Sequence, residues 1–154
     1  MLKSNRIKKA FIAAAVVVCM AAGATGLAAY NVDKITGIAA YRGYSGSFHP
    51  LVLLGANRDT INSALITAVT EGHKVTAGNL IDVGADPNWK SGWPLMVAAN
   101  QGDTATTKLL LDRGADIHAL DESALRMAER NGHVDTARLL REYSAKHQRS
   151  SGPT

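Results

Sequence analysis

The sequence has little of the material from which catalytic and metal sites are commonly built. Its 154 residues include a single cysteine, Cys19, which excludes an intrachain disulfide framework and a Cys-x-x-Cys metal or redox motif. It contains no glycine-rich phosphate loop and no serine nucleophile elbow. We therefore predict a non-enzymatic protein with no catalytic residue, no metal ligand and no cofactor. A small envelope enzyme or metal-binding protein, for example a hydrolase with two carboxylates, is the alternative.

The excess of positive charge is confined to the N-terminus. Lys3, Arg6, Lys8 and Lys9 account for four of the seventeen basic residues, so thirteen remain against thirteen acidic residues. A nucleic-acid-binding surface needs a concentrated basic face. The composition therefore predicts no nucleic-acid partner.

Residues 1–29 are predicted to be a signal peptide or an N-terminal membrane anchor. Residues 10–30 carry no charge, 11–20 form an apolar core, and Ala22-Gly23-Ala24 is a small-x-small cleavage site. Cleavage would deliver a periplasmic protein. The alternative is an inner-membrane anchor facing the periplasm, because the 21 uncharged residues are long enough to span a bilayer. The alanine and glycine content of these residues makes a stable span less favourable. The membrane is expected as a partner only if residues 10–30 stay uncleaved.

Residues 62–143 repeat one pattern at an interval of thirty residues. Leucines occupy positions 65, 95 and 125, alanines 68, 98 and 128, and glycines 72, 102 and 132. Twelve residues after each of the first two glycines comes Gly-Ala-Asp, at 84–86 and 114–116. A fixed period of this size indicates a solenoid in which each unit buries its apolar face against its neighbours.

The second unit predicts two short helices. Pro94 suits a first helical position, where its missing N–H breaks no hydrogen bond, and Leu95 and Ala98 follow at helical spacing. Gly102 is expected to end this helix in a left-handed conformation. Residues 104–112 predict a second helix, buried through its leucines. The unit is therefore a helix–turn–helix followed by a loop, here called the finger.

These motifs resemble the ankyrin-repeat family. Residues 93–103 are similar to the family pattern Thr-Pro-Leu-His-x-Ala-Ala-x-x-Gly-His, and are followed by three leucines and by Gly-Ala-Asp. The resemblance implies an all-α ankyrin-repeat solenoid of about three helix–turn–helix units, whose fingers are about three residues shorter than usual. The units would span 59–88, 89–118 and 119–147, after an N-terminal cover at 30–58 and before a flexible tail at 148–154.

The resemblance also implies a function and a surface. It implies a protein-binding module, and similar exported proteins neutralise toxins or support stress defence in the bacterial envelope. Finger tips and the exposed sides of first helices would line a concave binding face. The finger residues carried over are Asn88, Trp89, Lys90, Trp93, Leu120 and Asp121. The helix residues are Thr70, Glu71, Asn100, Gln101, Arg130 and Asn131. For Trp93 the alternative is packing between adjacent fingers.

The remaining polar residues that could form a site are explained by the same resemblance. His73 and His133 fall at the Gly-His position, where the family uses the ring for local hydrogen bonds. The pairs Asp82/Asp86 and Asp112/Asp116 are copies of one repeat position around Gly-Ala. We therefore predict that these aspartates are turn and helix-end residues.

The first unit and the segment before it are less regular. Residues 33–41 predict a short helix and 48–54 an apolar run, which together are expected to cover unit one in a non-repeat form; contact with a partner is the alternative. Asp59 or Thr60 is expected to cap the first helix of unit one. Gly78 in its second helix should make this unit the least stable.

We expect the exported protein to begin near Thr25, because the candidate cleavage site ends at Ala24. N-terminal sequencing of envelope fractions measures this directly. An intact Met1 on membrane-bound protein would support the anchor, and an intact Met1 on cytosolic protein would contradict both forms of export.

Overall fold

The fold, seen in a computed structural model that describes residues 27–44, 46, 48–49 and 55–150, is an all-α solenoid. Within these residues there are seven helices and no strand, so the predicted fold class is confirmed. The helices are α2 (Leu27–Tyr41), α4 (Arg58–Thr70), α5 (Lys74–Asp82), α6 (Trp89–Gln101), α7 (Thr104–Asp112), α8 (Ala119–Arg130) and α9 (Val134–Ser150).

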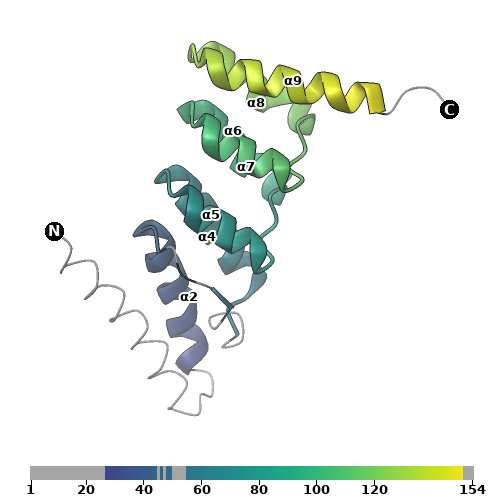
Figure 1. The fold of residues 1–154 in the computed structure, drawn as a ribbon. Coiled ribbons are helices and arrows are strands. Elements are labelled where there is room, and N and C mark those ends of the chain that lie inside the picture. The colour runs from purple at the N-terminus through teal and green to yellow at the C-terminus, as the bar shows by residue number, and fades with distance from the viewer. Residues whose placement is uncertain (1–26, 45, 47, 50–54, 151–154) are drawn as a thin grey trace.

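The helices stack as pairs, rising from α2 to α9 (Figure 1). Within a unit, α4 packs on α5, α6 on α7 and α8 on α9. Between units, α4, α6 and α8 contact one another in sequence, and so do α5, α7 and α9. The solenoid therefore has a first-helix layer (α4, α6, α8) and a second-helix layer (α5, α7, α9).

The core is made of leucine and alanine at repeated positions. The second-helix layer buries Leu80, Leu110 and Leu140 completely, and the first-helix layer does the same with Ala68, Ala98 and Ala128. Alanine lets neighbouring helices approach closely, while each leucine contributes about 1.5–3 kcal/mol on full burial. The thirty-residue pattern is therefore the pattern of contacts between units.

The helix ends agree with the sequence only in part: Pro94, expected at a first helical position, lies inside α6, after the non-helical residues 90–92. Gly102 ends α6 with a φ of 70°, as predicted. The cap of α4 is Asn57, whose Oδ1 accepts a hydrogen bond of 2.7 Å from the backbone N–H of Thr60. The expectation that Asp59 or Thr60 would cap this helix is wrong, because both lie inside its first turn.

The segment before unit one forms a helix in the register of the repeats. α2 packs against α4 (Figure 1), and Gly43 follows it with a φ of 65°. His73 reaches back over this glycine: its Nε2 lies 3.1 Å from the carbonyl oxygen of Tyr41. His133 does the same two units later, with Nε2 3.0 Å from the carbonyl oxygen of Asn100. The equivalent contacts show that α2 is the first helix of a further unit.

The end of this N-terminal unit also matches the others. Gly55-Ala56-Asn57 precedes Gly84-Ala85-Asp86 by 29 residues, and the φ of Gly55, 95°, is close to the 104° of Gly84. The described part of the cover predicted over 33–54 therefore follows the repeat pattern, which corrects the non-repeat form expected from the sequence. Its helix begins at Leu27 instead of residue 33, and residues 50–54 of the predicted apolar run lie outside the described residues.

Asparagine side chains anchor the fingers, with Asn62 contributed by α4 and Asn88 by the preceding finger. Asn62 Oδ1 accepts a hydrogen bond of 2.8 Å from the backbone N–H of Asp86. In the next step, Asn88 accepts from the backbone N–H of Asp116 at 2.6 Å and donates to the carbonyl of Gly114 at 2.9 Å. These bonds satisfy backbone groups that no helix or sheet would satisfy. The finger spacing is thereby tied to the spacing of the helices.

Polar contacts also join the second-helix layer. Arg113 pairs with Asp82 at 2.5 Å, and one unit later Asp112 accepts hydrogen bonds from Lys108 at 2.7 Å and from Tyr143. The bonds from Lys108 and Tyr143 lower the pKa of the Asp112 carboxyl. These groups are largely exposed, so the contacts add little to the core.

The two chain ends are only partly described. Residues 1–26 lie outside the described residues, and with them almost all of the predicted signal peptide or anchor. Within the described part of the chain, no helix has the length and apolar character needed to cross a bilayer. At the other end α9 continues to Ser150, so residues 148–150 of the predicted flexible tail are helical.

Leu110→Ala should lower the free energy of unfolding by about 2–5 kcal/mol, since Leu110 is fully buried. A solenoid of few units sums nearest-neighbour terms, so the lost free energy is a large part of the total stability. Urea unfolding followed by circular dichroism measures the free energy of unfolding, and the urea midpoint should fall. An unchanged urea midpoint would contradict the packing described here.

Gly78→Ala should stabilise the protein by about 0.5–1 kcal/mol, because glycine inside a helix is unfavourable. The added Cβ would lie 3.6 Å from Leu109 Cδ2, an ordinary contact. Gly102→Ala is the matched control and should destabilise, because its Cβ would lie 2.5 Å from Nδ1 of His133 at a positive φ. If both changes shift the unfolding midpoint in the same direction, this explanation is wrong.

Candidate partner-binding face

Two left-handed turns carry the finger residues into the first helices. In unit two the turn consists of Lys90, Ser91 and Gly92, with φ angles of 50°, 59° and 81°. In unit three the equivalent turn is 120–122, with φ angles of 49°, 55° and 58°. A non-glycine residue in this region costs about 1–2 kcal/mol. The surrounding contacts must therefore stabilise these turns. Each turn connects a shortened finger to the first helix of its unit.

The turn of unit two holds the two tryptophans around a lysine. The Lys90 ammonium lies 4.3 Å from the ring centroid of Trp89 and 5.1 Å from that of Trp93. Both are cation–π distances. Trp89 is half-buried, and Trp93 leaves 39% of its surface exposed. The arrangement gives a finger tip with two aromatic faces and one positive charge.

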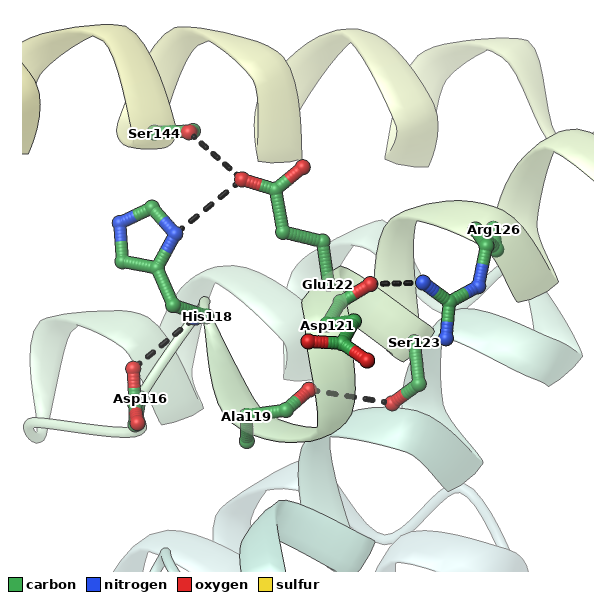
Figure 2. A network of polar contacts seen from close by, with 8 residues as sticks. All are labelled: Asp116, His118, Ala119, Asp121, Glu122, Ser123, Arg126 and Ser144. Atoms are coloured by element: carbon green, nitrogen blue, oxygen red, sulfur yellow. Dashed lines mark hydrogen bonds and ion pairs between the residues drawn. The ribbon is translucent and has the colours of Figure 1, made fainter.

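The turn of unit three is held by Arg126. Its guanidinium donates to the carbonyl of Leu120 at 2.9 Å. Across the turn it also donates to the carbonyl of Asp121 (Figure 2). The equivalent residue in unit two is Met96, which has no donor. Arg126 thus stabilises a turn without glycine, and the turn leaves Leu120 54% exposed.

A polar network ties this turn to the last helix. His118 Nδ1 and Ser144 Oγ both contact Glu122 Oε1, at 3.1 and 3.2 Å (Figure 2). The Ser144 hydroxyl donates to the carboxylate and not to the imidazole. A nucleophile of the Ser–His–Asp type needs a hydrogen bond to its base. The contacts therefore join α8 to α9.

A comparison with protein families agrees with this architecture. A model of ankyrin repeats (3 copies) matches residues 37–121 and 65–151. The chain belongs to the ankyrin-repeat family. The first match begins inside α2, in agreement with an N-terminal ankyrin unit. A search of characterised proteins found no significant match.

The helix residues predicted for binding lie at the C-terminal ends of α4, α6 and α8, the first helices of the three ankyrin units. Thr70, Asn100 and Arg130 are the exposed final or near-final residues of α4, α6 and α8. Gln101 donates to the carbonyl of Thr70 at 2.8 Å, and Asn131 donates to the carbonyl of Asn100 at 3.0 Å. Gln101 and Asn131 therefore join adjacent units. Glu71 is exposed at the same end.

The two predicted groups of residues do not converge on one pocket. From Trp93 to Gln101 the helix rises about 12 Å, at about 1.5 Å per residue. The finger group and the helix-end group therefore lie at opposite ends of the first-helix layer. Of the finger residues, Asn88 joins units and Asp121 supplies a carbonyl to Arg126. A binding role for the others stays a prediction.

Arg126 was missed by the sequence analysis. It occupies the position that Ile66 and Met96 occupy in units one and two. A basic residue at a position that is apolar in the other units was the available signal. Its role depends on the left-handed turn, and the repeat pattern does not predict that turn.

The histidines and aspartates have the structural roles that the family resemblance predicted. His73 and His133 make the local contacts described above. Asp86 and Asp116 accept hydrogen bonds from backbone N–H groups two residues later, and Asp82 and Asp112 lie at helix ends. Among the described residues there is no group of three His, Cys, Asp or Glu side chains that could hold a metal ion.

Proposed function

We propose that this protein binds a protein partner through its finger tips and the adjoining side of the first-helix layer. Ankyrin repeats are interaction modules, so the question is which surface is used. We name as the finger patch Trp89, Lys90, Trp93, Leu120 and Arg126. The observation that carries the proposal is the exposure of two large apolar side chains at the left-handed turns: Leu120 lies within its turn, and Trp93 directly follows the turn of unit two.

The composition of the finger patch supports this choice. Tryptophan and arginine dominate binding hot spots, and both occur here beside an exposed leucine. The Lys90 contacts and the Arg126 hydrogen bonds restrain the two turns before a partner arrives. Restrained side chains lose less entropy on binding. The patch is therefore suited to anchor a partner, while Thr70, Asn100 and Arg130 would contribute at the far end of the face.

We also propose that the protein works in the bacterial envelope. The support is in the sequence: a basic start, an uncharged stretch over 10–30 and a small-residue cleavage site. A partner in that compartment fits a toxin-neutralising or envelope stress-support role. The proposal of a protein partner does not depend on this location.

Trp89→Ala should weaken partner binding by about 1–2 kcal/mol, as hot-spot truncations do, because the change removes an aromatic face of the finger patch. A partner would first be recovered from periplasmic extract with the full-length protein as bait, and its affinity then measured by calorimetry. Circular dichroism of the variant should stay close to that of the wild type, since Trp89 lies outside the leucine and alanine core.

Val134→Ala is the matched control, because Val134 is an apolar residue 74% exposed at the start of α9, outside the finger patch. It should leave affinity unchanged. Normal binding by Trp89→Ala, together with loss of binding after exposed changes in α2 such as Ile38→Ala, would contradict the proposal and place the partner on the N-terminal unit.

A further inference from the structure

We propose that Trp89 and Trp93 form a binding site for an organic cation, which Lys90 fills in the free protein and an arginine side chain of the protein partner fills in the complex. The inference rests on the proposed function and specifies the chemistry of the partner. It follows from the geometry of the turn that separates the two tryptophans.

Two indole rings share one cation in this turn. The ammonium of Lys90 lies 4.3 Å from the ring centroid of Trp89 and 5.1 Å from that of Trp93. Both distances are within the range of about 6 Å over which the face of an aromatic ring attracts a cation. The turn of unit two therefore provides a single cation position with two aromatic walls.

The arrangement around Tyr143 is the reverse. There one ring faces two ammonium groups, those of Lys108 and Lys146, at 5.9 and 5.8 Å from its centroid. Lys108 is also paired with Asp112 at 2.7 Å. That contact is therefore part of an ion-pair network and offers no position between two rings.

The course of the backbone, more than the lysine side chain, places the two rings. Trp89 precedes and Trp93 follows the left-handed turn of residues 90–92. This turn packs against the next unit, because a Cβ added to Gly92 would lie 2.8 Å from the Cβ of Ala119. The two indoles should therefore keep their positions when the Lys90 side chain moves away.

Lys90 can leave this position at little cost. Its side chain is exposed, and within the described part of the chain it forms no ion pair. A cation–π contact at an exposed site is weak, and an ammonium that leaves the rings is hydrated again by solvent. Trp93 is 39% exposed, so the site is open to a side chain from outside. Lys90 is therefore a replaceable occupant.

A guanidinium is better suited to this position than an ammonium. It is planar, more weakly hydrated and stacks on aromatic faces, so it loses less hydration between two indoles. The two fingers also carry the exposed carboxylates of Asp86, Asp116 and Asp121, which offset the charges of Lys90 and Arg126. An arriving arginine is therefore not repelled by the fingers.

The test uses a blocked Leu-Arg-Leu peptide and two twins, in which citrulline or lysine replaces arginine. Citrulline keeps the planar shape without the charge, and the leucines serve the apolar part of the finger patch. The full-length protein reports binding through the fluorescence of Trp89 and Trp93, its only tryptophans. We expect the arginine peptide to bind about twofold to fivefold more tightly than the citrulline twin, the range of an exposed cation–π contact, with the lysine twin between them.

Lys90→Gln is the decisive variant, because it empties the site and leaves both rings. It should tighten the arginine peptide about twofold to fivefold and leave the citrulline twin unchanged. Lys74→Gln is the matched control: it removes an equal charge from an exposed position on α5, in the other layer, and should change neither peptide.

Trp93→Leu removes one aromatic wall but keeps an apolar side chain. It should abolish the preference for arginine over citrulline, with binding reported by the fluorescence of Trp89. Circular dichroism checks its folding, and Trp89→Leu, reported by Trp93, makes the same test from the other wall.

Several outcomes would overturn the inference: no binding of the arginine peptide, equal binding of its citrulline twin, weaker binding of the arginine peptide by Lys90→Gln, or an equal gain from Lys74→Gln. If all three peptides bind equally and Trp93→Leu weakens each of them, the cation site fails while the proposed function stands. If neither the peptides nor a recovered partner respond to changes in the finger patch, the proposed function fails as well.

Discussion

The structure depends on the burial of leucine and alanine between consecutive units. Leu80, Leu110 and Leu140 are fully buried in one layer, while small alanines let the helices of the other layer approach closely. No single unit could bury these faces by itself. This constraint explains why α2 covers the face that α4 presents to it, and why α9 packs on α8, where Ser144 also bonds to Glu122.

The shortened finger has its own consequence. With fewer residues to return the chain to the next helix, the backbone passes through left-handed turns at 90–92 and 120–122. Unit two meets this cost with Gly92, whose added Cβ would lie 2.8 Å from the Cβ of Ala119, and unit three meets it with Arg126. The same left-handed turn is thus stabilised in two different ways, by a glycine in unit two and by an arginine in unit three. The two finger tips therefore present different side chains.

The finger side of the molecule therefore differs chemically from its second-helix layer. In the second-helix layer Lys108 pairs with Asp112 and Arg113 with Asp82, whereas the fingers of units two and three present indole rings, an exposed leucine and the Lys90 ammonium. At the far end of the first helices, Gln101 and Asn131 are engaged in joining units. The chemistry available to a partner is therefore concentrated at the fingers and on the exposed side of α8.

The sequence by itself determined the period, the helix over 104–112 and the left-handed end at Gly102, because these follow from local spacing and from the conformational freedom of glycine. The all-α class came from the resemblance to ankyrin repeats. The sequence also contained the N-terminal unit, in Gly43 and Gly55-Ala56-Asn57, but the interval of 29 residues and the asparagine in place of aspartate concealed it. Only the tertiary structure decided that Asn57 caps α4, that Lys90 lies between two indoles and that Arg126 holds the turn of unit three. Each of these depends on the course of the backbone through the finger. That course is set by the distance between stacked units and not by the residues of the turn alone.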